Sequence, residues 1–106
     1  MRQMTVAELA ERLAVGGDKP VLLDVREPWE FEICHIEGSQ PMPMGSVPAR
    51  AGELDAQAET VVVCHHGGRS AQVGMFLERQ GFRNVINLAG GVAAWAAQVD
   101  PAMPRY

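Results

Sequence analysis

The sequence is poor in cysteine, in long apolar runs and in positive charge, and each shortage excludes a class of protein. Its 106 residues include only two cysteines, Cys34 and Cys64, and no Cys-x-x-Cys pair, which excludes a disulfide-rich framework. No apolar stretch reaches the roughly 18 residues that a transmembrane helix needs. The net charge is −4, without a basic run, which argues against a nucleic acid or an anionic membrane as the main partner.

The N-terminal segment is amphipathic and charged, and it lacks the continuous apolar core of a signal peptide. Together with the few cysteines, this predicts a cytoplasmic protein. The composition is ordinary for a globular chain, with 47% hydrophobic and 21% charged residues. Its length, with no repeat or linker, predicts one domain over residues 1–106, and residues 100–106 are expected to form a loose C-terminal tail.

Hydrophobic periodicity predicts alternating strands and helices. Thr5 and Glu8 have the spacing of a capping box, so a helix is expected to begin at Val6. Three short, apolar runs predict buried strands at residues 20–25, 60–64 and 84–88. Helices are expected at residues 6–13, around 46–55, at 70–80 and at 91–99, and residues 26–45 are expected to form a loop with one short strand near 39–41. This alternation predicts an α/β fold with a mostly parallel sheet.

The most informative segment is Val61–Ser70, with the sequence VVVCHHGGRS. It places Cys64 at the carboxyl end of a predicted parallel strand, where open α/β sheets bind ligands. The next helix begins just beyond, and the positive end of its dipole favours an anion such as a thiolate. Gly67 and Gly68 allow backbone amides to turn toward the sulfur, while Arg69 adds a cation suited to an oxyanion. The pattern predicts a nucleophilic cysteine inside an anion-binding loop.

Two other interpretations of this loop are a buried structural cysteine and a zinc site. Cys64 as a small buried hydrophobe would leave the glycines and Arg69 unexplained. Zinc accepts the side chains of Cys34, His35, Cys64, His65 and His66. However, consecutive residues rarely reach one ion, and the cysteine spacing matches no common zinc motif, so no metal is expected.

Three side chains of the loop have less definite expected roles. His65 and His66 are expected to be exposed and to shape the pocket, and proton transfer by either of them is an open alternative. The hydroxyl of Ser70 is expected either to cap the helix or to donate toward the sulfur.

Four segments, in this order along the chain, resemble the motifs of rhodanese-like domains. The matching segments are Leu22–Glu30 to LxDVREPxE, Cys34–Ser39 to GHIPGA, Cys64–Ser70 to the active loop CxxGxRS, and Gly81–Trp95 to GFxNVxxLxGGxxxW. The resemblance covers nearly the whole chain. The chain departs from the motifs at Cys34, Glu37 and Ser39, which lie outside the active loop, so local loop shape is affected more than the chemistry.

The resemblance implies a rhodanese-like α/β domain with a central five-stranded, mostly parallel sheet and helices on both faces. It also implies an enzyme of the thiosulfate sulfurtransferase (rhodanese) type, in which Cys64 carries sulfur as a persulfide. A small donor anion such as thiosulfate would give up its outer sulfur, and cyanide, a thiol or a protein acceptor would then remove it. No cofactor is implied.

The same resemblance assigns roles to the surrounding residues. Arg69 is expected to hold the sulfonate end of the donor, and the amides of His65, His66, Gly67, Gly68, Arg69 and Ser70 are expected to stabilise the terminal sulfur. From their place at the end of the preceding strand, and not from the resemblance, Asp24 and Arg26 are expected to support the site, and a substrate role for Arg26 is an open alternative. In that support, Asp24 accepts hydrogen bonds from the loop and Arg26 pairs with Glu30 or Glu27.

Two alternatives belong to other functional classes. Cys-dependent phosphatases and arsenate reductases related in fold use a C-x5-R loop around a tetrahedral oxyanion. The spacing from Cys64 to Arg69 is C-x4-R, which is one residue shorter. The second alternative is a binding module that carries a persulfide without turnover, and only a measured rate of sulfur release distinguishes it from an enzyme.

Overall fold

The computed structural model describes all residues, 1–106, and contains one five-stranded sheet. Its strands are β1 (Arg2–Met4), β2 (Val21–Asp24), β3 (Gln40–Pro41), β4 (Thr60–Val63) and β5 (Val85–Leu88). They lie in the order β1-β5-β4-β2-β3, and every neighbouring pair is parallel. The α/β prediction is confirmed. The residue patterns gave no sign of β1, because three residues are too few to show an alternation.

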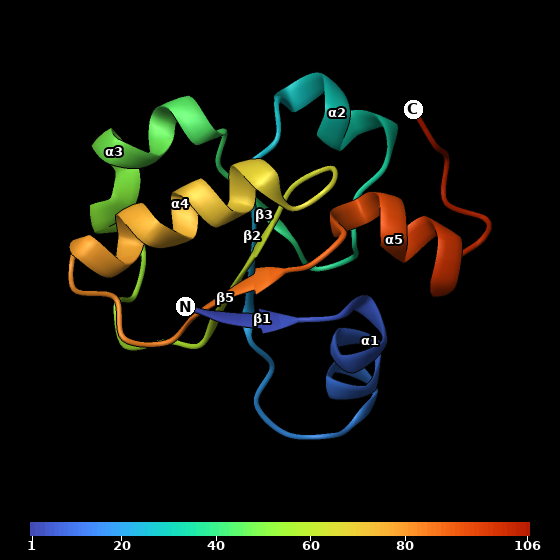
Figure 1. Ribbon diagram of the computed structural model, residues 1–106, viewed down its shortest axis with the longest axis horizontal. Coiled ribbons are helices and arrows are strands. Elements are labelled where there is room, and N and C mark those ends of the chain that lie inside the picture. The colour runs from blue at the N-terminus through green and yellow to red at the C-terminus, as the bar shows by residue number, and fades with distance from the viewer.

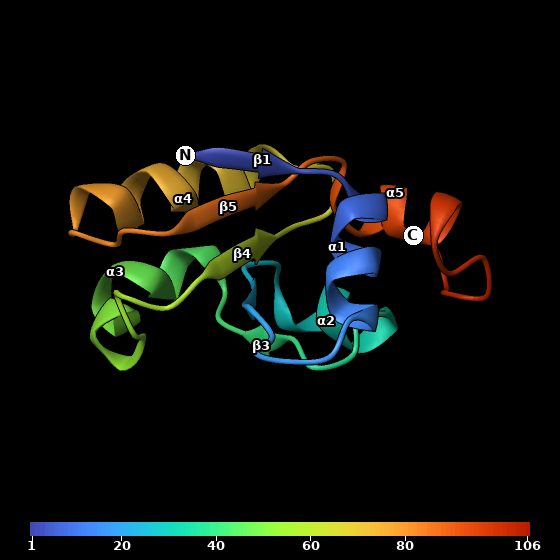
Figure 2. The ribbon, with the colours of Figure 1, turned by 90° about the horizontal axis from the view of Figure 1, so that it is seen from below.

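Five α-helices connect and cover the strands. They are α1 (Val6–Ala14), α2 (Pro28–Ile33), α3 (Val47–Arg50), α4 (Gly68–Arg79) and α5 (Gly91–Gln98), with short 3-10 turns on both sides of α3. Figures 1 and 2 show α3 and α4 on one side of the sheet and α1 and α5 on the other. None of these helices has the length and apolar character needed to cross a membrane.

The two faces of the sheet carry separate hydrophobic cores, and β4 contributes to both. Val61 and Val63 belong to the core beneath α1 and α5, whereas Val62 and Cys64 belong to the core beneath α3 and α4. This follows from the strand geometry, since successive side chains point to opposite faces. Cys64 therefore leaves the end of β4 on the side of the sheet that α4 covers.

Local signals at the helix starts were read correctly for α1 and missed for α2. The Thr5–Glu8 capping box is present, with Glu8 N donating to Thr5 Oγ1 at 3.1 Å. Residues 28–33 were expected to be loop, which is wrong. Pro28 occupies the first turn of α2, and the Glu27 amide donates to Glu30 Oε1 at 3.0 Å. Six helical residues are too few to display a helical period, so only the cap could have indicated this helix.

The expectation of a loose tail at residues 100–106 is also wrong. Met103 is buried in the core under α1 and α5. The Tyr106 hydroxyl donates to Glu30 Oε2 at 2.7 Å and accepts from Arg26 Nη1 at 2.9 Å. Figure 1 shows the C-terminal end of the chain beside α2. These partners lie far back in the sequence, so no local pattern indicated that they hold the tail.

Candidate active site

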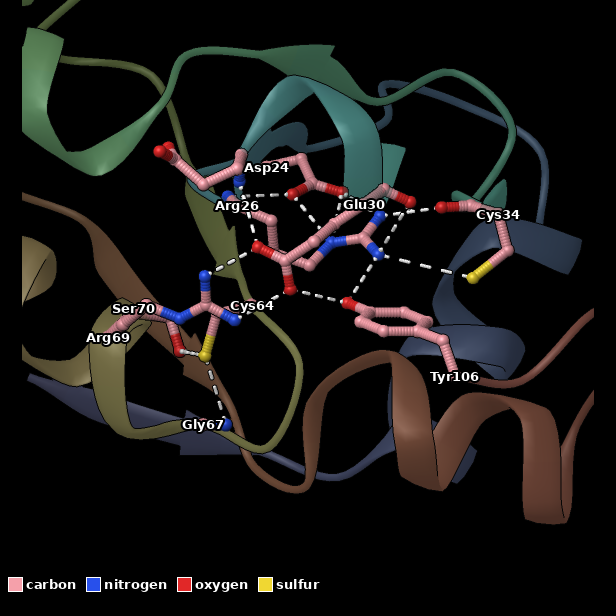
Figure 3. A network of polar contacts seen from close by, with 10 residues as sticks. Asp24, Arg26, Glu30, Cys34, Cys64, Gly67, Arg69, Ser70 and Tyr106 are labelled. Atoms are coloured by element: carbon pink, nitrogen blue, oxygen red, sulfur yellow. Dashed lines mark hydrogen bonds and ion pairs between the residues drawn. The ribbon is translucent and has the colours of Figure 1, made fainter. Parts of the chain in front are cut away.

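Cys64 occupies the position between the end of β4 and the start of α4. Its side chain is 1% exposed. The amide of Gly67 donates to Cys64 Sγ at 3.0 Å, and Ser70 Oγ lies 3.3 Å from the same sulfur (Figure 3). Gly67 has a φ of +110°, and its amide turns back toward the sulfur. The first-turn amides of α4 have no carbonyl partner within the helix, so the sulfur lies at a positive helix end.

The start of α5 fixes the first residues of this loop. Val92 N donates to the Cys64 carbonyl at 2.9 Å and Ala93 N donates to the His65 carbonyl at 3.0 Å. A Cβ atom on Gly91 would lie 2.3 Å from the Cys64 carbonyl oxygen, and the φ of Gly91 is +57°. The double glycine at the start of α5, with Gly90 at the N-cap and Gly91 in the first turn, therefore lets that helix start directly against the active loop.

Ser70 links the sulfur to the sheet. Its hydroxyl donates to Asn87 Oδ1 at 2.5 Å, and Asn87 Nδ2 donates to Gln3 Oε1 at 2.9 Å. Both Ser70 and Asn87 are buried. Asn87 lies in β5, where its neighbours are apolar, and the hydrogen bonds explain why an amide is tolerated there. The chain of contacts holds the Ser70 hydroxyl in place beside Cys64.

Arg69 makes an ion pair with Glu30 instead of facing an empty pocket. Its Nη1 and Nη2 atoms donate to Glu30 Oε1 and Oε2 at 2.7 and 2.9 Å. The Glu30 side chain is 4% exposed and that of Arg69 is 34% exposed. The hydrogen bonds from Arg69 lower the pKa of Glu30 to about 2, against the opposing effect of burial. The fork that was expected to hold a donor sulfonate is thus occupied by a carboxylate of the chain itself.

Asp24 and Arg26 form a second, fully buried pair behind the first. Arg26 Nε and Nη2 donate to the Asp24 carboxylate at 2.9 and 2.7 Å, and the Arg26 amide donates to Asp24 Oδ1 at 3.1 Å. Arg26 also donates to the carbonyls of Glu30 and Cys34. Burial by itself lowers the pKa of Arg26, but the hydrogen bonds with Asp24 and Tyr106 outweigh it and leave the pKa raised. The prediction that Arg26 pairs with the Glu30 or Glu27 carboxylate is wrong, because the Glu30 carboxylate is bound by Arg69 and Asp24, as buried as Arg26, accepts its hydrogen bonds instead.

Aromatic rings cover the outer side of the loop. His65 stacks between His66 and Tyr106, with ring centroids 4.1 Å apart on each side. Trp29 is 58% exposed and meets Tyr106 edge-on. Burial, followed by the proximity of His66, lowers the pKa of His65, so this imidazole is neutral near neutral pH. His66 is exposed as expected and His65 is half-buried.

The larger hollows of the molecule lie outside the loop itself. A cavity of about 760 Å³ lies between α1, α5 and residues 35–38 and includes no residue of the Cys64 loop. A smaller one of about 170 Å³ is lined by Cys34, His65, His66 and Tyr106, among others. No three His, Cys, Asp or Glu side chains lie close enough together to bind one metal ion.

Reasoning from the sequence missed two residues of this site, Asn87 and Tyr106, and gave Glu30 the wrong partner. The place of Glu30 in a helix carried a usable signal, because a glutamate three residues after Glu27, with Pro28 directly after Glu27, is typical of a helix start. Asn87 was visible as the one polar residue within an apolar strand. Tyr106 gave no signal, since its partners lie 76 and 80 residues earlier in the chain.

Comparisons with known proteins agree with this architecture. The model of the rhodanese-like domain family matches residues 5–98. A sulfurtransferase from Allochromatium vinosum is 38% identical over 88 residues, which cover 83% of this chain and 81% of that protein. A thiosulfate sulfurtransferase GlpE from Pseudomonas fluorescens is 40% identical over 88 residues, with 83% and 79% covered. These relatives support sulfur transfer as the general chemistry.

Longer proteins and solved structures match as well. A rhodanese-like/PpiC domain-containing chloroplastic protein from Arabidopsis thaliana is 37% identical over the whole chain, which spans 38% of its length. The chain spans 24–43% of three other curated relatives. A rhodanese-like domain protein from Staphylococcus aureus superposes with a TM-score of 0.84 at 29% identity, with 90% of this chain and 91% of that one covered. With a family match over residues 5–98 and a solved relative that superposes at a TM-score of 0.84, this chain belongs to the rhodanese-like domain family.

Proposed function

We propose that the protein is a sulfurtransferase that moves a sulfane sulfur through a persulfide on Cys64. The donor is a compound such as thiosulfate, and the acceptor is thiophilic, either cyanide or a thiol. The single observation that carries the proposal is the position of Cys64 Sγ, 3.0 Å from the Gly67 amide and at the first turn of α4. Such a position favours a thiolate and a terminal sulfur that bears negative charge.

The two half-reactions balance without a cofactor. In the first, the Cys64 thiolate attacks the outer sulfur of the donor, a new S–S bond forms at Sγ, and the old S–S bond breaks. With thiosulfate, the electron pair of that bond leaves on sulfite. In the second, the acceptor attacks the outer sulfur and the electron pair returns to Cys64 as a thiolate. The amides of the loop stabilise the charge on the outer sulfur.

The phosphatase alternative has less support from the same loop. A phosphoryl group spreads its charge over three equatorial oxygens and needs donors around all of them. The loop is one residue shorter than C-x5-R, and the Arg69 fork is bound to Glu30. We therefore expect no significant hydrolysis of aryl phosphates.

The decisive test is the intact mass of the protein after incubation with thiosulfate or a persulfide donor. Cys64 should gain one sulfur atom, and cyanide should remove it and form thiocyanate. Cys64→Ser should gain none and should remain folded, whereas Cys34→Ser should load normally. Loading on Cys34, or aryl phosphate hydrolysis without any gain of sulfur, would refute the proposal.

A further inference from the structure

The two arginines near Cys64 are both neutralised by carboxylates of the chain. Arg69 donates to both oxygens of Glu30, and Arg26 donates to both oxygens of Asp24. The remaining N–H groups of Arg26 are also engaged, by the carbonyls of Glu30 and Cys34 and by Tyr106. The four charged side chains therefore add up to zero net charge, and the chain as a whole carries −4.

Glu30 is held firmly in this arrangement. Its Oε1 accepts from the Glu27 amide at 3.0 Å and from Arg69, and its Oε2 accepts from Arg69 and from the Tyr106 hydroxyl (Figure 3). With four donors on two oxygens, an incoming anion cannot displace the carboxylate without leaving it buried and unpaired, which is strongly unfavourable. The pair thus excludes a competing anion from the inner face of Arg69.

Because no net positive charge remains beside Cys64, a sulfur donor is disfavoured more strongly the more negative charge it carries. Thiosulfate is doubly negative and strongly hydrated. At the site it is repelled by the Glu30 carboxylate, and Arg69 offsets this repulsion only in part because it is already paired with Glu30. A thiol persulfide, R–S–SH, brings at most one negative charge at the sulfur and needs only the loop amides. Both donors present one terminal sulfur to Cys64, which is 1% exposed. Behind that sulfur thiosulfate carries three sulfonate oxygens, whereas a thiol persulfide carries a narrow, two-coordinate sulfur that fits more readily.

We propose that Glu30 is a specificity-determining residue, which occupies the Arg69 fork and makes small thiol persulfides better donors than thiosulfate. This rests on the sulfur-transfer function proposed above. In the preferred step, the Cys64 thiolate attacks the outer sulfur of R–S–SH, the Sγ–S bond forms and the S–S bond of the donor breaks. The proton stays on the transferred sulfur, and the electron pair leaves as the thiolate RS⁻.

The experiment compares cysteine persulfide with thiosulfate as donors by single-turnover loading of Cys64, read from intact mass. In the unmodified protein, the second-order rate constant of loading by cysteine persulfide should exceed that by thiosulfate by at least about tenfold, equivalent to about 1.4 kcal/mol. Glu30→Gln preserves shape and a cap acceptor but leaves Arg69 with an unneutralised charge. It should raise the use of thiosulfate relative to cysteine persulfide about tenfold. Glu53→Gln, which removes a carboxylate from the exposed pair with Arg50, should leave the ratio unchanged.

The outcomes separate the two proposals. If neither donor loads Cys64, the sulfurtransferase function itself fails. If both donors load Cys64 and thiosulfate loads it as efficiently as cysteine persulfide does, the function stands and the role of Glu30 is refuted. A folded Glu30→Gln protein with an unchanged donor ratio refutes it too. If Glu30→Gln does not fold, the ratio of the loading rates of cysteine persulfide and thiosulfate in the unmodified protein still tests the proposal, because that measurement requires no substitution.

Discussion

The pairing of Arg69 with Glu30 determines what removal of Arg69 should do. Arg69→Ala leaves the Glu30 carboxylate, 4% exposed, without its charged partner, so we expect a loss of about 2–3 kcal/mol in the free energy of unfolding, measured in urea. This is at the low end for buried pairs because Arg69 itself is one-third exposed. Arg50→Ala, in the exposed pair with Glu53, should change the free energy of unfolding far less, because solvent screens that pair. Equal effects of the two substitutions would mean that the Arg69 pair is solvated and adds little to stability.

The same carboxylate makes stability depend on acid pH. The pKa of Glu30 is lowered from 4.5 to about 2 in the folded protein, so its contribution is present above pH 4.5 and is lost as pH falls from 4.5 toward 2. That contribution amounts to at most about 3 kcal/mol. In Glu30→Gln, the free energy of unfolding should fall less steeply over this range. Parallel curves for the variant and the unmodified protein would show that other carboxylates cause the acid sensitivity.

Among the elements, the start of α5 is the one most sensitive to an added methyl group. Gly91→Ala places a Cβ atom 2.3 Å from the Cys64 carbonyl oxygen, at a φ of +57°. The left-handed backbone and the overpacking together should lower the free energy of unfolding by about 2–5 kcal/mol and should displace the loop. Loading of sulfur on Cys64 should fall with it. The control is Gly52→Ala, since a Cβ atom at Gly52 meets nothing within 4 Å, and it should leave stability and sulfur loading nearly unchanged. Comparable losses in the Gly91 and Gly52 variants would contradict the close contact of α5 with the loop.

For the whole molecule, the docking of the C-terminal segment can be followed through its tyrosine, which is the only one in the chain. Burial, the largest effect, raises the pKa of Tyr106 from 10.0 to about 12. Phenolate absorbance should therefore appear near pH 12 in the folded protein and near pH 10 in urea. The stability that the neutral phenol adds is present below pH 10 and is lost as pH rises toward 12. A folded protein that titrates near pH 10 would have a free tail.

The sequence by itself determined the elements whose patterns are local and strong. The runs before Asp24, Cys64 and Ala89 are short and mostly apolar, and such short runs favour buried strands over helices. The capping box at Thr5 and the glycines around the Cys64 loop acted in the same way, because each requires only neighbouring residues. The position of Cys64 at a strand end, beside a helix start, followed from these patterns alone.

Only the tertiary structure decided which charges meet and what the tail does. Arg69 could pair with any of 13 acidic side chains, and its partner Glu30 lies 39 residues away. The choice arises because the parallel order of β2 and β4 brings the residues after both strands to one edge of the sheet, where a buried carboxylate must find a cation. Tyr106 reaches Arg26 over 80 residues because the segment after α5 ends beside α2. Charge pairing acts through space and has no period along the chain, so the sequence predicted the nucleophile but not the ion pairs around it.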